Sequence, residues 1–322
     1  MARLHAQTQI GSWAIFLTLC VGRAIRNRKL HVIIACSLLV LLWTEARHRV
    51  LIDGPHTLCV AVFSAPTEAS AACRQTARET WLSLDDGVRH YFFIGDQNLP
   101  PQVSEALSNE NRNAGDVVLL PFVDSYRNLT LKLLHSIKYL VEKCDCKYIL
   151  KADDDTFARV DLIVSELEVV KVEQRLYWGY FTGRAPIFRR GTWAETDWFL
   201  CDRYLPYARG GGYIFSHRVA KYIADNSPIL QRYRSEDVSF GVWTAGLQLH
   251  RVHDPRFDTE YTSRGCLNSY LVTHKQSSSQ MYEKMKNIRT KGRLCPKGEE
   301  GETRESYSYN WTVLPSQCCK PT

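Results

Sequence analysis

The chain has 322 residues, enough for one large domain with additional segments. Its 45% apolar and 23% charged residues exclude whole-chain disorder and a polytopic membrane protein. The net charge is +7, with 41 basic against 34 acidic residues, but five of the basic residues lie within residues 1–44, which contain no Asp or Glu. The remaining chain is nearly balanced. This argues against a nucleic-acid-binding domain, which would concentrate basic residues in its folded part.

An uncharged segment, Leu30–Trp43, follows a basic cluster that ends at Lys29. As a helix it spans about 21 Å, which is short for a membrane core of about 30 Å but suits the thinner early-secretory membranes. Because basic flanks stay in the cytosol, we predict a cytosolic tail over residues 1–29, a transmembrane signal-anchor over 30–46 and a lumenal remainder. The alternative is a signal peptide cleaved near residues 44–46.

The lumenal part is predicted to begin with a short stem over residues 47–56 and to continue as one folded domain over 57–322. Nine of the eleven cysteines follow the predicted span. In an oxidising compartment most of them should pair, and their odd number leaves at least one without a partner; the spacing leaves the pairing open. Two sequons, at Asn128 and Asn310, are candidate N-glycosylation sites.

From residue 57 onward, short apolar runs alternate with segments of helical spacing. Expected strands cover residues 57–64, 91–94, 117–120 and 148–152, and expected helices cover residues 69–82 and 129–142. This alternation indicates an open α/β sheet, and such sheets bind ligands beyond the carboxyl ends of their strands. The polar tail from Gly292 onward is expected to be a loop.

Three adjacent carboxylates, Asp153, Asp154 and Asp155, follow the last of these strands. They repel one another, which costs stability unless a cation offsets their charge. Mg²⁺ and Mn²⁺ prefer oxygen ligands and often bridge to a diphosphate. We therefore favour a divalent metal site over an acidic solvated loop. His253 and His274 are candidates for a further ligand, although a lone histidine is more often structural.

Two other segments have both a structural and a functional interpretation. Ser235-Glu236-Asp237 can begin a helix, with Ser235 as its cap, or can supply a general base for an acceptor hydroxyl. The three glycines at 210–212 can form a tight turn or can let the backbone approach a bound sugar closely. The spacing leaves both interpretations open for each segment.

Five motifs follow one another along the chain. They are Arg74-x-x-x-Arg78-x-Thr80-Trp81, Asp124-x-Tyr126-x-Asn128-Leu-Thr-x-Lys132, Lys151-x-Asp153-Asp-Asp155, Tyr207-Ala-Arg-Gly-Gly-Gly-Tyr213 and Glu236-Asp237-Val238. In this order they resemble the Golgi β-1,3-glycosyltransferases, which are inverting, metal-dependent enzymes of the GT-A fold that use UDP-sugars. The resemblance covers about residues 57–290. It implies an open mixed central sheet flanked by helices, and a lumenal catalytic domain held at the Golgi membrane by the anchor.

The resemblance also assigns roles to individual residues. Asp237 matches the catalytic base, and Asp155 and His274 match the ligands of Mn²⁺ (or Mg²⁺), with Asp153 and Asp154 supporting the metal and the ribose. The residues expected to bind the nucleotide sugar are Arg74, Arg78, Lys151, Asp153, Asp154, Gly211, Gly212 and Glu236. In an inverting transfer the acceptor attacks from the face opposite the nucleotide, so the base and the metal site must lie apart.

Further segments, among them His253-Asp-Pro-Arg-Phe-Asp-Thr-Glu-Tyr261 and Tyr270-Leu-Val-Thr-His-Lys-Gln276, resemble the family branch that builds the glycosaminoglycan linkage region. This implies transfer of the second galactose from UDP-galactose to Gal-β1,4-Xyl-O-Ser on a proteoglycan core protein. One alternative is a β-1,3-galactosyl- or N-acetylglucosaminyltransferase acting on another glycoprotein or glycolipid acceptor. Another is a Golgi lectin or assembly partner that has lost catalysis.

Overall fold

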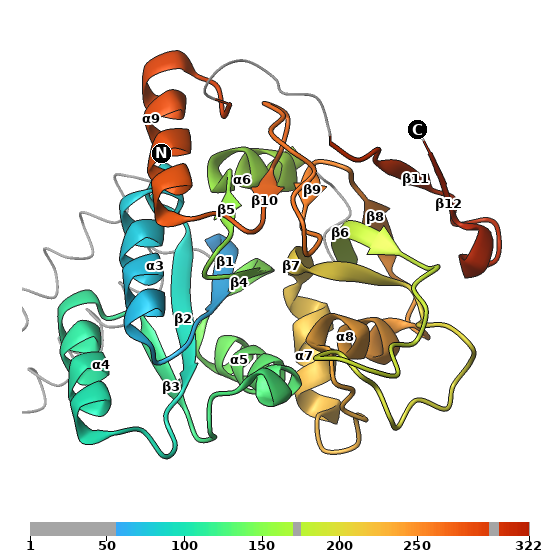
Figure 1. Cartoon of the computed structure of the whole chain (residues 1–322), viewed down its shortest axis with the longest axis horizontal. Coiled ribbons are helices and arrows are strands. Elements are labelled where there is room, and N and C mark those ends of the chain that lie inside the picture. Colours follow the sequence, from blue (N-terminus) through green and yellow to red (C-terminus); the bar gives the residue numbers. More distant parts are fainter. Residues whose placement is uncertain (1–55, 170–174, 296–302, 322) are drawn as a thin grey trace, which may run out of the picture. The chain divides into compact units, whose positions relative to one another are not determined.

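The computed structural model describes residues 56–169, 175–295 and 303–321 (Figure 1). The predicted cytosolic tail, the signal-anchor and nearly all of the stem lie outside these residues. Within the described ranges, no helix has both the length and the apolar character needed to cross a membrane.

A seven-stranded sheet forms the centre of the domain, with strand order β3-β2-β1-β4-β7-β6-β8 (Figure 1). Its strands are β1 (His56–Phe63), β2 (Arg89–Gly95), β3 (Val117–Leu120), β4 (Cys146–Asp153), β6 (Leu176–Thr182), β7 (Tyr207–Ser216) and β8 (His250–His253). Strands β1 to β4 pair in parallel, whereas β7 runs antiparallel to both β4 and β6. The four predicted strands are therefore confirmed, and so is the open mixed sheet.

Helices cover both faces of this sheet (Figure 1). They are α3 (Glu68–Glu79), α4 (Pro101–Ala114), α5 (Leu129–Lys143), α6 (Val160–Val169), α7 (His217–Asn226), α8 (Glu236–Thr244) and α9 (Ser278–Lys291). Because side chains alternate along a strand, Leu58 and Val60 of β1 join the apolar core under α3, α6 and α9. Cys59 and Ala61 join the opposite core under α5, α7 and α8.

The two predicted helices form, with one change of boundary. The helix over 129–142 appears as α5 almost unchanged. The helix predicted over 69–82 ends at Glu79, because Thr80 leaves the helical conformation, and Trp81–Leu84 forms a 3₁₀ turn. Trp81 is completely buried there, so tertiary packing rather than helical spacing decides the conformation of this segment.

A second, three-stranded sheet consists of β5 (Phe157–Ala158), β9 (Phe257–Asp258) and β10 (Val272–Thr273). Thr273 of β10 lies opposite Phe157 of β5 in an antiparallel pair. Since β5 begins just after the aspartate triplet, this pairing places the residue that follows β10 beside the triplet.

The C-terminal segment differs from the expected loop. β11 (Tyr307–Tyr309) and β12 (Cys319–Pro321) form an antiparallel hairpin, with a 3₁₀ turn at Pro315–Gln317. The ring of Tyr307 stacks on that of His253, and Tyr309 stacks on Trp311. Aromatic packing against the domain therefore holds a segment whose overall polarity indicated a loop.

Cysteine pairing is less extensive than an oxidising compartment led us to expect. Cys266 bonds to Cys295, and the adjacent residues Cys318 and Cys319 bond to each other. The five cysteines of the described residues that are not in a disulfide are Cys59, Cys73, Cys144, Cys146 and Cys201. The prediction that most of the nine would pair is thus wrong for this structure.

Candidate active site

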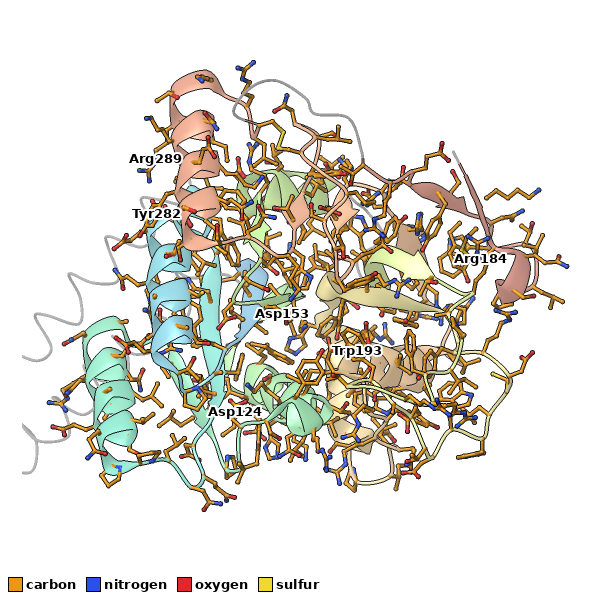
Figure 2. The ribbon with its side chains drawn as sticks, viewed as in Figure 1. Asp124, Asp153, Arg184, Trp193, Tyr282 and Arg289 are labelled. Atoms are coloured by element: carbon orange, nitrogen blue, oxygen red, sulfur yellow. A yellow bond between two sulfur atoms is a disulfide. The ribbon has the colours of Figure 1, made fainter. Side chains whose placement is uncertain are left out.

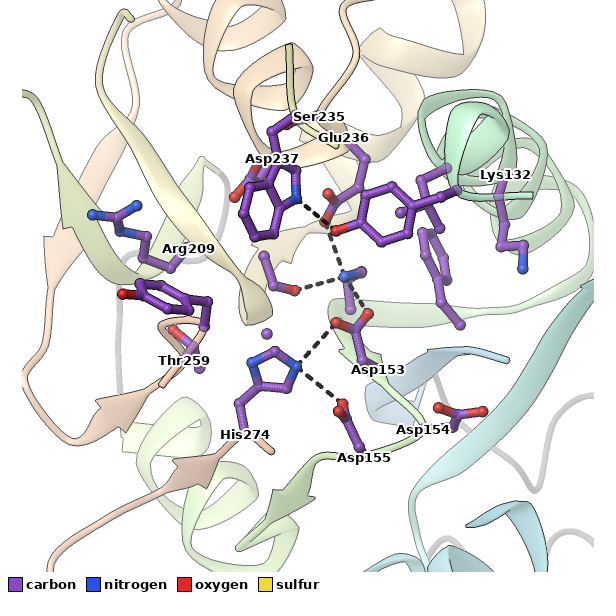
Figure 3. A pocket seen from close by; sticks show the side chains of 18 of the residues that line it. Lys132, Asp153, Asp154, Asp155, Arg209, Ser235, Glu236, Asp237, Thr259 and His274 are labelled. Carbon is purple, nitrogen blue, oxygen red and sulfur yellow. Dashed lines mark hydrogen bonds and ion pairs between the residues drawn. The ribbon is translucent and has the colours of Figure 1, made fainter. Parts of the chain in front are cut away.

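A cavity of about 850 Å³ opens at the carboxyl end of β4, where the predicted ligand site should lie. The end of β1, Gly210 and Gly211 of β7, the first turn of α8 and the loop after β10 also line it, whereas Gly212 does not. Figure 3 shows Glu236 and Asp237 on one side of this cavity, with Asp155 and His274 on the other. The volume is in the range of sites that bind small molecules and cofactors.

Asp153, Asp155 and His274 converge on one point of the cavity wall. One ligand atom from each lies within 4.8 Å of the others. The Nε2 atom of His274 is 3.3 Å from a carboxylate oxygen of Asp153 and 3.0 Å from one of Asp155 (Figure 3). The structure therefore brings together the two predicted metal ligands, and it places Asp153, which was expected to support the metal, in the same group.

The orientation of the His274 ring shows that the cluster of Asp153, Asp155 and His274 needs a positive charge. Its Nδ1 lies 3.0 Å from the carbonyl oxygen of Glu260, an atom that only accepts, so Nδ1 carries a hydrogen. In the neutral ring the lone pair of Nε2 then points at two carboxylates, an arrangement that is repulsive unless a proton or a cation lies between them. Two carboxylates and one imidazole are a donor set that suits a divalent transition-metal ion.

A proton competes with a metal for the same position. Burial opposes a charge on His274, but the hydrogen bonds and negative charges of Asp153 and Asp155 outweigh it and raise the pKa of His274 to about 9. Burial likewise opposes ionisation of Asp155, but His274 holds the pKa of that carboxyl below its ordinary value. Because a metal must displace the proton, metal affinity should increase with pH up to this range.

Asp154 points away from the other two aspartates. Its carboxylate accepts a hydrogen bond of 2.8 Å from the Ser64 hydroxyl, and its backbone N–H donates to the carbonyl of Phe63. Burial raises the pKa of Asp154 above its ordinary value. Asp154 therefore lies at the cavity wall but outside the metal group.

The two arginines predicted to hold the nucleotide lie in an ion-pair network behind this wall. Arg74 makes two hydrogen bonds to Glu110 of α4 and donates to the Ser64 hydroxyl at 3.0 Å. Arg78 bonds to Glu110 and to Asp116, which precedes β3. Neither arginine is among the residues that line the cavity. The network ties α3 to α4 and β3, and only Arg74 approaches the site, through Ser64.

Lys151 connects the metal group with the predicted base. Its ammonium lies 2.7 Å from Asp153, 2.9 Å from Glu236 and 2.6 Å from the carbonyl oxygen of Gly210. Burial opposes its charge, but the two carboxylates outweigh burial and raise its pKa. Lys151 and Glu236, both predicted to bind the nucleotide sugar, are thus paired with each other at the cavity wall.

The glycines at 210–212 lie inside strand β7, so of the two interpretations left open by the spacing the tight turn does not form. A Cβ atom on Gly211 would lie 2.5 Å from two ring atoms of His274, and one on Gly212 would lie 2.8 Å from a methyl carbon of Val272. A Cβ on Gly210 would lie 3.1 Å from Glu236. These glycines allow His274 and the preceding strand β10 to pack directly on β7.

We expect Gly211→Ala to weaken Mn²⁺ binding by roughly 10- to 100-fold, because the new methyl group displaces the His274 ring and such displacement of a ligand has effects of this size. Isothermal titration of the purified domain with Mn²⁺ measures it. Gly246→Ala is the matched control, since a Cβ there has no atom within 4 Å. Wild-type Mn²⁺ affinity in Gly211→Ala would contradict this account of the glycines.

Asp237 lies in the first turn of α8, and Ser235 precedes the helix without a side-chain cap bond. One Asp237 oxygen accepts a 2.8 Å hydrogen bond from the backbone N–H of Val238. Burial and the negative charge of Glu236 outweigh that bond and raise the pKa of Asp237 to about 7. Asp237 can therefore lie in the first turn of a helix and also act as a general base. A carboxylate with this pKa is well matched to proton abstraction near neutral pH.

Other residues of the predicted motifs have structural roles. Lys132 contacts both carboxylate oxygens of Asp124, at 2.9 and 2.7 Å, and so fixes the loop between β3 and α5 at the cavity. His253 is bonded to the backbone of Phe181 and Tyr307, which leaves His274 as the candidate metal-ligand histidine. Of the two sequons, Asn310 is exposed and Asn128 is half-buried.

Sequence reasoning missed a group of exposed aromatic side chains that line the cavity, which we call the aromatic rim: Tyr126, Phe188, Trp193 and Tyr261. The indole N–H of Trp193 donates to the Tyr126 hydroxyl at 2.6 Å, and the Trp193 ring lies near those of Phe188 and Tyr261. Figure 2 shows Trp193 and Asp153 in the same central region. Tyr126 and Tyr261 belong to the motif segments 124–132 and 253–261, but the four rings come from three separate segments of the chain, so no local pattern indicated that they would meet.

Comparison with known proteins agrees with this geometry. Residues 72–255 match the model of the galactosyltransferase family. The chain is similar to mouse beta-1,3-galactosyltransferase 6, with 46% identity over 82% of each chain. It is 34% identical to the Arabidopsis thaliana hydroxyproline O-galactosyltransferase GALT2, over 70% of this chain but only 34% of that protein.

Among solved structures, a mannosyltransferase from Pyrobaculum calidifontis, in complex with GDP-Man and Mn²⁺, covers 63% of this chain and 55% of its own, with 10% identity and a TM-score of 0.37. The family match and the mouse relative carry the assignment. The chain belongs to the galactosyltransferase family and is a glycosyltransferase of its β-1,3 group.

Proposed function

We propose that this enzyme is an inverting β-1,3-galactosyltransferase that uses UDP-galactose and Mn²⁺ (or Mg²⁺). Its acceptor is Gal-β1,4-Xyl-O-Ser on a proteoglycan core protein, to which it adds the second galactose of the glycosaminoglycan linkage region. The observation that carries this proposal is one cavity with Asp237 on one side and the Asp153–Asp155–His274 group on the other. The 46% identity to mouse beta-1,3-galactosyltransferase 6 supports the choice of donor, linkage and acceptor.

The two sides of the cavity suit the two halves of an inverting transfer. Asp237 takes the proton of the acceptor hydroxyl as that oxygen attacks the anomeric carbon. Asp153, Asp155 and His274 would hold the metal, which supplies a Lewis acid that stabilises the departing diphosphate. The Lys151 bridge keeps both sides at a fixed separation, since it bonds to Asp153 and to Glu236 beside the base.

The aromatic rim supports a sugar acceptor near Asp237. Aromatic rings provide rigid apolar surface against which the C–H face of a pyranose packs. We expect Trp193→Ala to raise the acceptor KM by roughly 3- to 10-fold and to leave the UDP-galactose KM unchanged. Phe199→Ala is the control, because Phe199 is more exposed than Trp193 and does not line the cavity. An unchanged acceptor KM would remove the rim from acceptor binding.

The pKa of Asp237, raised to about 7, predicts the pH profile of transfer. The active base is the ionised form, so kcat/KM should fall by about tenfold per pH unit below pH 7 and level off above it. Glu236→Gln removes the charge of Glu236, so it should lower the pKa of Asp237 and move the fall in kcat/KM to lower pH. Rates are measured at saturating Mn²⁺, so that protonation of His274 does not contribute. If kcat/KM of Glu236→Gln falls at the same pH as that of the wild type, Glu236 is not the cause of the raised pKa of Asp237.

One assay tests the specificity. The purified domain is given UDP-galactose, UDP-N-acetylglucosamine or UDP-N-acetylgalactosamine, each with Gal-β1,4-xyloside or with other galactosides as acceptors. We expect β-1,3-linked galactose on Gal-β1,4-xyloside. A product only from another pair would support the alternative, a β-1,3-galactosyl- or N-acetylglucosaminyltransferase acting on another acceptor. Metal-dependent UDP binding without any product would support a lectin or assembly partner.

Location at the Golgi membrane, as a single-pass type II protein with a lumenal catalytic domain, is part of the same proposal. It is supported by the basic cluster that precedes the uncharged segment Leu30–Trp43. Protease treatment of intact Golgi vesicles should leave the catalytic domain protected, and detergent should expose it. Degradation in intact vesicles would contradict this orientation.

A further inference from the structure

Lys275 follows the metal-ligand histidine and has an unusual backbone conformation. Its φ is +60°, in the left-handed region that favours glycine. Hydrogen bonds on both sides hold it there: the His274 N–H donates to the carbonyl of Asp258 at 2.9 Å, and the Gln276 N–H donates to that of Asp155 at 2.8 Å. A lysine kept in this conformation at a site wall points to a function for its side chain.

The charge of the cavity gives that side chain a role. Seven carboxyl side chains line the cavity, against four lysines and arginines. Such a lining repels a nucleoside diphosphate unless cations in the site offset the charge. The donor diphosphate therefore needs a cationic side chain in addition to the metal.

The cationic residues of the lining differ in how firmly they are held. Lys132 and Lys151 are almost completely buried, and each bonds at short range to carboxylates. Arg209 lies beside Tyr207 and Glu260. Lys275 is 49% exposed, and its ammonium contacts Asp155, a metal ligand, at 2.9 Å. It is thus the lining lysine best placed to change its partner at the metal.

We propose that Lys275 is a diphosphate-binding residue that exchanges partners: its ammonium bonds to Asp155 in the free enzyme and to the diphosphate of the donor once Asp155 holds the metal. This inference rests on the proposed use of a UDP-sugar. A lysine ammonium is a mobile point charge that suits phosphate oxygens. Its flexible stem allows the exchange while the backbone stays fixed.

The exchange predicts two effects of opposite sign when the charge is removed. In Lys275→Met, Mn²⁺ alone should bind more tightly than in the wild type, because a cation no longer competes for Asp155. UDP at saturating Mn²⁺ should bind roughly 10- to 100-fold more weakly, because a charge-assisted contact is lost. Both affinities are measured by isothermal titration, independently of turnover. A purely structural ion pair would not produce the weaker UDP binding.

Two variants separate the side chain from the backbone. Lys275→Gly removes the ammonium but suits the left-handed conformation, so it should fold at least as stably as the wild type and show the same loss of UDP affinity. Lys275→Arg should retain most of that affinity. Lys286→Met, on an exposed face of α9 away from the cavity, makes the same change in net charge and should alter neither affinity.

The results distinguish this inference from the proposed function. If the wild type does not bind UDP at saturating Mn²⁺, the proposed function fails. If the wild type binds UDP and Lys275→Met and Lys275→Gly bind it equally well, the function stands and the role of Lys275 is overturned. Weaker UDP binding in both variants, with unchanged binding in Lys286→Met, supports the inference.

Discussion

Asp237→Asn is expected to lower kcat for galactosyl transfer by about 10²- to 10⁴-fold, the usual contribution of a general base. Asparagine has nearly the same shape but cannot take the acceptor proton. Asp237 is the residue of α8 with the strongest case for this role, since it lines the cavity and burial with the charge of Glu236 raises its pKa to about 7. Initial rates with UDP-galactose and Gal-β1,4-xyloside measure the effect.

The same variant should bind UDP as tightly as the wild type, because Asp237 lies across the cavity from the metal group (Figure 3). This separates loss of the base from loss of the fold or of donor binding. Asp225→Asn is the matched control, since Asp225 is an exposed partner of Lys221 on α7. Near-wild-type turnover in Asp237→Asn would show that another group accepts the proton.

Loss of the metal group should have a comparable effect. Asp155→Asn and His274→Ala are each expected to reduce kcat/KM by at least roughly 10²-fold, because Lewis-acid stabilisation of a leaving group contributes several kcal/mol. Chelation of divalent ions should abolish wild-type activity, and added Mn²⁺ should restore it. The cause is structural as well as chemical, since His274 faces two carboxylates whose negative charge needs a cation.

Controls for this prediction come from the same chain. His250→Ala changes an exposed histidine of β8 that does not line the cavity, so it should leave activity and Mn²⁺ affinity unchanged. Mn²⁺ titration of Asp155→Asn and His274→Ala should show weakened binding together with the lower rate. Full activity in excess chelator would rule out the Asp153–Asp155–His274 group as a catalytic metal site.

Much of the fold can be read from the sequence where its pattern is local. The apolar runs that predicted β1, β3 and β4 are each buried by adjacent elements, and the helical spacing over 129–142 gave α5. The predictions failed where a long-range contact outweighs the local pattern. The helix predicted over 69–82 ends at Glu79, because the next turn is fixed by the burial of Trp81. For the glycines at 210–212 the spacing left a turn and a close approach open, and the close approach of His274 places them within β7.

The candidate site shows the same division. Three aspartates at the end of an apolar strand predict a cation site, but nothing in their spacing separates Asp154 from the other two. The structure does so, because Ser64 at the end of β1 turns Asp154 away while His274 approaches Asp153 and Asp155. The role of His274 itself was implied only by the resemblance to a family.

The residues expected to bind the nucleotide were the least predictable part. Arg74 and Arg78 are one helical turn apart, which fits an anion site and an ion-pair network equally well. In the structure both arginines form ion pairs, with Glu110 of α4 and with Asp116 of the segment before β3, so they belong to the network. Lys275 has no sequence signal of its own, because its left-handed backbone results from hydrogen bonds on either side.

The sequence by itself determined the alternation of strands and helices, the carboxylates at the end of β4 and the family. Periodicity and short motifs are properties of neighbouring residues, so they need no knowledge of the fold. Only the tertiary structure decided which charges meet: the pairing of β5 with β10 brings His274 to the aspartates, and Lys151 joins Asp153 to Glu236. The partner of a charged side chain depends on strand pairing between distant segments, and that partner determines whether the charge binds a ligand or stabilises the fold.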